Sequence, residues 1–232
     1  MNLFLFFLLS LTLNYLLPCN RNQDNLALKT QVDNHLVERF VELMAQFEPE
    51  RVASYVHMVE SDNVPKLLEI CQKYSLTEAS SVLLERQGNI SAAYELLLGN
   101  LQDHIRQLFQ VPEIQENGSK NWTRFHSASQ SVIDFCQRQS ISMTEKDREK
   151  IWLTLLDALL QPQRSLRENQ PSNIDSILTV LREETQRVVT SVQGQVSLTK
   201  ILPRLLEDTK TAGSMLGDLR QLIMGKATQL LN

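Results

Sequence analysis

The sequence has few of the residues that break regular structure. It holds seven glycines and seven prolines in 232 residues. An all-β fold needs many tight turns, which these residues supply, so their scarcity argues against one. Aromatic residues make up only 6%, but the hydrophobic share of 42% is enough for a sizeable core. The composition therefore favours an all-α protein.

Cysteine and excess charge are also scarce. Cys19, Cys71 and Cys136 lie far apart, are odd in number and form no CxxC pair. This pattern is typical of reduced thiols in a cytosolic protein rather than of a disulfide framework. The formal charge is −4 and no basic stripe occurs, so we expect no nucleic-acid partner.

Recognisable catalytic motifs are missing as well. No GxGxxG, P-loop, GxSxG or HExxH sequence occurs. The histidines His35, His57, His104 and His126 are scattered, and none pairs with a cysteine or carboxylate at ligand spacing. We interpret His104, beside Asp103, as a solvated helix residue. We therefore expect no catalytic, cofactor-binding or metal-binding residue, no cofactor and no enzyme activity.

One apolar run stands at the start of the sequence, from Leu3 to Leu17. It has the length of a signal-peptide core and is short for a spanning helix, but no Lys or Arg precedes it and no small-residue cleavage site follows. We interpret it as an extra leader, with a signal or membrane anchor as the alternative. Three sequons, at Asn89, Asn117 and Asn121, would be glycan acceptors only in a secreted chain. Asn89 has the character of a helix cap.

The next stretch has the rhythm of stacked helical hairpins. Apolar residues recur at helical spacing, and predicted helices begin near residues 34, 49, 64, 77 and 89, about 13 to 15 residues apart. Pro49 and Pro65 suit first turns, Thr77 is a candidate cap, and Gly88 is a candidate stop. Short loops make neighbouring helices antiparallel. The fold predicted is an α-solenoid of stacked antiparallel hairpins.

The second half continues in the same way after a polar break. We predict loops over 110–120 and over 161–171 because both stretches are polar and contain proline. Helices are predicted between and beyond these loops, over 122–139, 144–160, 174–192, 198–206 and 216–231. The chain then divides into a leader and connector (1–30), a first solenoid section (31–110), a loop (111–120) and a second solenoid section (121–232).

Two features admit either a structural or an interaction role. Glu85-Arg86 could be an ion-paired binding surface, but we interpret it as a solvated helix end before Gly88. Trp122 and Trp152 could anchor a partner. Each lies on an apolar helical stripe, so we expect both in the core.

The stretch Val64 to Leu98 reads VPKLLEICQKYSLTEASSVLLERQGNISAAYELLL. It resembles the signature of the vacuolar protein sorting-associated protein 8 family, subunits of the CORVET endosomal tethering complex. Upstream, HLVERFVELMAQFEPERVASYV resembles the family's preceding helix pair. Downstream, LTKILPRLLEDTK and LGDLRQLIMG resemble later solenoid helices, so the resemblance spans about residues 33 to 225.

This resemblance implies a clathrin-heavy-chain-repeat solenoid in a cytosolic protein that is peripheral to early and late endosome membranes. It implies a role in endosomal vesicle fusion and in endosome-to-vacuole or lysosome transport. Its partners would be other tethering-complex subunits. The family's β-propeller, used near membranes and Rab GTPases, and its RING zinc domain have no counterpart in these 232 residues. We therefore expect a fragment that keeps subunit contacts without Rab binding; the alternative is a membrane-anchored or secreted helical protein unrelated to tethering.

Overall fold

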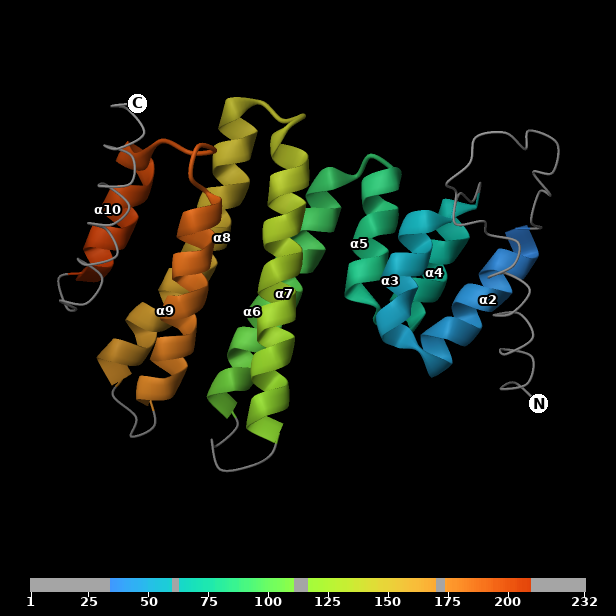
Figure 1. Ribbon diagram of the computed structural model, residues 1–232, viewed down its shortest axis with the longest axis horizontal. Helices are drawn as coiled ribbons and strands as arrows, with labels where there is room; N and C mark the ends of the chain where they lie inside the picture. The colour runs from blue at the N-terminus through green and yellow to red at the C-terminus, as the bar shows by residue number, and fades with distance from the viewer. Residues whose placement is uncertain (1–33, 60–62, 111–116, 170–173, 210–232) are drawn as a thin grey trace, which may run out of the picture. The chain divides into compact units, whose positions relative to one another are not determined.

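The computed structural model describes residues 34–59, 63–110, 117–169 and 174–209. All regular structure in these residues is helical (Figure 1). The helices are α2 (Asn34–Phe47), α3 (Pro49–Met58), α4 (Val64–Lys73), α5 (Thr77–Arg86), α6 (Ile90–Gln110), α7 (Asn117–Ser140), α8 (Glu145–Asn169), α9 (Ile174–Ser191) and α10 (Leu198–Thr209). The predicted all-α class is confirmed. The predicted helix over 216–231 lies outside the described residues.

The chain forms two compact units, Met1–Leu96 and Leu97–Asn232, whose boundary falls inside α6. In the first unit α2 packs against α3, and α4 against α5. In addition α2 packs against α4, and α3 against α5. Equivalent helices of two successive hairpins are thus in contact, which is the stacking that an α-solenoid uses.

The helices of the second unit also stack on their neighbours and on the next helix but one. Helix α7 packs against α8, and α8 against α9, while α7 also packs against α9 and α8 against α10. The predicted stacking of antiparallel hairpins is therefore confirmed within each unit. The functional division into sections 31–110 and 121–232 stays a prediction.

The core of the first unit follows the predicted apolar stripes. Phe40 of α2 meets Tyr55 of α3 edge-on, with ring centroids 5.0 Å apart. Aliphatic side chains from α2 to α5, including Val41, Val52 and Leu83, are fully buried around them. Burial of these side chains drives the hairpins together, at about 1.5 to 3 kcal/mol for each large aliphatic residue.

Two left-handed residues end α4 and α5 in the same way. After α5, Gly88 has φ +76°, and the amides of Gly88 and Asn89 donate to the carbonyls of Glu85 and Leu84. This is a Schellman motif. The Asn89 side chain then accepts a 3.3 Å hydrogen bond from the Ala92 amide, which caps α6. The predicted stop at Gly88 and cap at Asn89 are both confirmed, whereas the predicted Thr77 cap is wrong because Leu76 occupies that position.

After α4 the left-handed position holds Ser75, with φ 55°. We expect Ser75→Gly to raise the free energy of unfolding by about 1 kcal/mol, because glycine adopts this conformation without a Cβ clash. Gly88→Ser is the matched reverse change and should lower the free energy of unfolding. A Cβ at Gly88 would meet nothing within 4 Å, so the decrease would come from backbone conformation alone. Urea denaturation measures both. Stabilisation by both variants, or destabilisation by both, would contradict the left-handed conformation of Ser75 and Gly88.

In the structure, helices extend into both predicted loops. Helix α8 continues through Pro162 to Asn169, so the predicted loop over 161–171 is wrong for 161–169. The proline removes one backbone donor, and its ring crowds the carbonyl one turn earlier. Gln163, which is fully buried, donates from Nε2 to the carbonyl of Leu159 at 3.1 Å and to Thr185 Oγ1 of α9 at 2.8 Å. This tie holds the helix on its neighbour beyond the proline.

Helix α7 likewise begins at Asn117, five residues before the predicted start at Trp122. Polar residues do not oppose the first turn of a helix, and Gly118 costs only about 1 kcal/mol there. Of the predicted loop 111–120, residues 117–120 are therefore helical. Residues 111–116 lie outside the described part of the chain.

Candidate functional site: charged surfaces of the helical stacks

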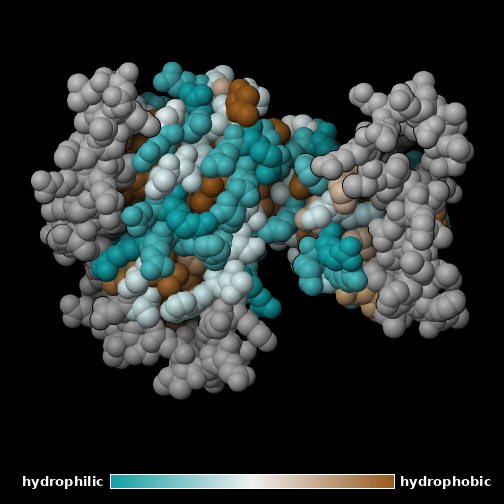
Figure 2. Space-filling view, viewed as in Figure 1, coloured by the Kyte–Doolittle hydropathy of each residue, from teal (hydrophilic) through white to brown (hydrophobic). Residues whose placement is uncertain are grey.

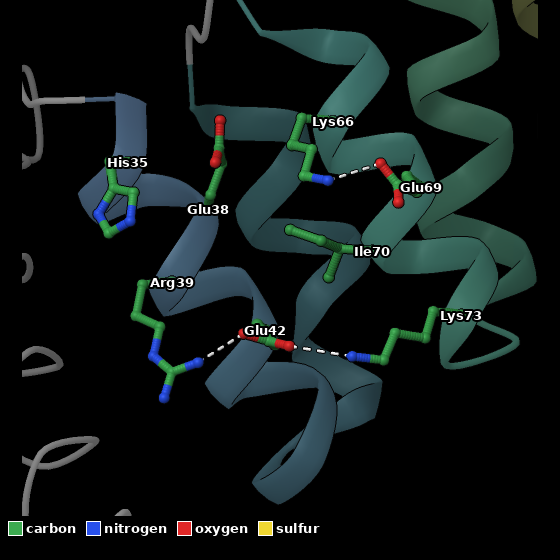
Figure 3. Close-up of a pocket in the computed structure, with 8 residues that line it drawn as sticks. All are labelled: His35, Glu38, Arg39, Glu42, Lys66, Glu69, Ile70 and Lys73. Atoms are coloured by element: carbon green, nitrogen blue, oxygen red, sulfur yellow. Dashed lines mark hydrogen bonds and ion pairs between the residues drawn. The ribbon is translucent and has the colours of Figure 1, made fainter.

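A hollow of about 230 Å³ lies between α2 and α4 in the first unit (Figure 3). Helices α2 and α4 each supply four side chains to it; these are His35, Glu38, Arg39 and Glu42, and Lys66, Glu69, Ile70 and Lys73. Within each helix the four residues recur at helical spacing, so they share one face. Lys73 and Glu42 are 31 residues apart in sequence, and the same offset relates the other three pairs. The hollow is therefore built from equivalent positions of two successive hairpins.

Glu42 is the centre of the charge arrangement in this hollow. Its carboxylate accepts from Arg39 at 2.6 Å within α2 and from Lys73 of α4 at 3.1 Å. The hydrogen bond from Lys73, together with that from Arg39, lowers the pKa of Glu42. The carboxyl stays ionised at neutral pH, so it can attract a cation or hold the two helices together but cannot supply a proton.

One further ion pair lies within α4, and two hydrogen bonds join the ends of α4 to α2. Lys66 and Glu69 of α4 form a 2.7 Å ion pair, and the Asn63 amide donates to Glu38 of α2 at 2.5 Å. Gln46 of α2 donates to the Tyr74 hydroxyl at 2.7 Å. Charges of both signs thus alternate around an aliphatic side chain, Ile70. Such a surface suits protein recognition, where charge patterns set register and exclude wrong partners.

Arg86 ties α5 to the end of α3. Its guanidinium donates to the carbonyls of Val59 at 2.6 Å and His57 at 2.8 Å. His57 lies in the last turn of α3 and Val59 is its C-cap residue; carbonyls at a helix end have no partner within the helix and carry partial negative charge. Arg86 is exposed at the end of α5, as predicted, and in addition it bonds the backbone that ends α3. The sequence gives no local signal for this bond, because its partners are 27 and 29 residues away.

We expect Arg86→Met to lower the free energy of unfolding by about 1.5 to 3 kcal/mol, the range for hydrogen bonds from a charged donor. Arg51→Met is the matched control. Arg51 forms a 2.6 Å pair with Glu48 at the surface, and exposed pairs contribute less than about 1 kcal/mol. Chemical denaturation of both variants gives the comparison; equal losses would show that the carbonyl contacts contribute nothing extra.

A second polar cluster joins α7 and α9 in the second unit. Glu184, only 4% exposed, accepts from His126 Nδ1 at 2.5 Å and from Arg187 Nη1 at 3.0 Å. Arg187 also donates to Gln130 of α7. The sequence did not predict this histidine–carboxylate pair, since 58 residues separate its members. Only the stacking of α9 on α7 brings them together.

The guanidinium of Arg187 is the nearest neighbour of the His126 ring besides Glu184. A general base needs its outer ring nitrogen free to accept a proton from a nucleophile or water. Here the outer nitrogen, His126 Nε2, lies 3.0 Å from Arg187 Nη1. The same Arg187 Nη1 lies 2.8 Å from His126 Nδ1, so the guanidinium is close to both ring nitrogens. The cluster is a brace between helices.

The two cysteines in the described residues are buried. Cys71 and Cys136 are buried free thiols, and burial raises the pKa of each, to about 11 for Cys71 and about 12 for Cys136. Such thiols are poor nucleophiles at neutral pH. Within the described residues no cluster of three or more His, Cys, Asp or Glu side chains could hold a metal ion.

The two tryptophans have opposite environments. Trp152 is fully buried and donates from Nε1 to Ser140 Oγ at 2.9 Å, so its predicted core position is confirmed. Trp122 is 38% exposed, so its predicted core position is wrong: it lies near the start of α7, where a helix has fewer neighbours. In Figure 2 polar residues cover most of the described surface in view, with scattered hydrophobic residues between them.

Comparison with known proteins confirms the resemblance drawn from the sequence. The chain is 28% identical over 198 residues to the vacuolar protein sorting-associated protein 8 homologs of Mus musculus and Homo sapiens. The match covers 84% of this chain but only 14% of the mouse protein and 13% of the human protein. No protein-family model matches the chain. No solved structure matches it either.

Proposed function

We propose that this chain is a membrane-trafficking scaffold, a helical segment of a CORVET-like endosomal tethering complex. In that role it supports endosomal vesicle fusion and endosome-to-vacuole or lysosome transport. The observation that carries the proposal is the similarity to vacuolar protein sorting-associated protein 8 homologs over 198 residues. Because the match spans about one seventh of those proteins, the proposed activity is that of a contact segment, not of the whole relative.

The described surfaces support a binding role. Stacked hairpins bury their apolar faces on one another and leave long faces for partners. The hollow between α2 and α4 offers charges of both signs around Ile70. A neighbouring subunit with complementary charges would gain register and association rate from this pattern. We propose other tethering subunits as the partners, in the cytoplasm at the surface of endosomes, and no catalytic activity.

Within the described residues, no helix has the length and hydropathy that crossing a membrane requires. The run from Leu3 to Leu17 lies outside these residues, so the alternative of an anchored or secreted protein rests on that run and the sequons alone. Expression of the full chain in animal cells separates the two functions. The scaffold proposal predicts no glycan on Asn117 or Asn121 by mass spectrometry; an attached glycan would favour the secreted alternative.

The proposed partners can be tested by affinity capture with purified proteins. Immobilised full-length chain should retain at least one recombinant tethering subunit and should not retain a GTP-loaded endosomal Rab. The double variant Arg39→Glu, Lys73→Glu should lower subunit retention, by about tenfold in Kd, because it removes both cations that pair with Glu42. Arg106→Glu, whose 2.9 Å pair with Asp103 lies within α6, is the control. Retention of the Rab, or of no subunit at all, would contradict the proposal.

A further inference from the structure

We draw no further inference here: the strongest candidate, the charged hollow that α2 and α4 form in the first unit, belongs to the site already described, and nothing in the described residues shows which chemical group occupies it.

Discussion

Trp152→Ala lowers the free energy of unfolding by about 3 to 5 kcal/mol, the range for removing a large buried aromatic side chain. Trp152 is 0% exposed in α8, and its Nε1 donates to Ser140 Oγ, which in turn donates to the Cys136 carbonyl at 2.6 Å. Truncation leaves a cavity and removes the donor that ties α8 to the end of α7. A domain stabilised by about 5 to 15 kcal/mol would lose a large share of its stability.

Trp122→Ala is the matched control for this prediction. The same atoms are removed from a side chain that is 38% exposed, so we expect a loss of about 1 kcal/mol. Each variant keeps one tryptophan as a fluorescent probe, and urea denaturation gives both midpoints. Equal losses in the two variants would contradict the described burial of Trp152.

Leu84→Asp unfolds the first unit or lowers its free energy of unfolding by about 3 to 5 kcal/mol, the penalty for an uncompensated buried charge. Leu84 is 8% exposed on α5, which packs against α3 and α4. Thermal melting followed by far-UV circular dichroism measures the loss. A melt unchanged from wild type would refute this placement of Leu84.

Gln102→Asp is the control for the charge itself. Gln102 is exposed in the interior of α6, so the new carboxylate keeps its hydration and we expect a change within about 0.5 kcal/mol. Leu84→Ala separates the cavity from the charge. It should cost about 2 to 3 kcal/mol, clearly less than the aspartate.

The helices of the first unit could be predicted because each has a wide apolar stripe and a local stop. Glycine at position 88 is needed for its left-handed φ of +76°, and Asn89 caps the next helix through its own side chain. Both signals depend on residues within one turn. Periodicity and local chemistry therefore located the helix starts to within a residue.

The errors come from contacts between residues far apart in sequence. Pro162 and its polar neighbours predict a loop, but Gln163 is held by Thr185 of α9, 22 residues away. Arg86 is exposed as expected, but its bonds to the carbonyls of His57 and Val59 could not be predicted. The His126–Glu184 pair forms only when α9 stacks on α7. Composition and spacing cannot indicate such pairs, because they depend on which helix faces the residue after folding.

Size-exclusion chromatography of purified components tests the scaffold role most directly. The wild-type chain is first checked for helical structure and a cooperative melt, and it is then mixed in turn with each recombinant tethering subunit. The Leu84→Asp variant is mixed with the same subunits in parallel. We predict that the wild-type chain co-elutes with at least one subunit and that the unfolded variant co-elutes with none. A folded wild-type chain that elutes alone in every mixture would contradict the account.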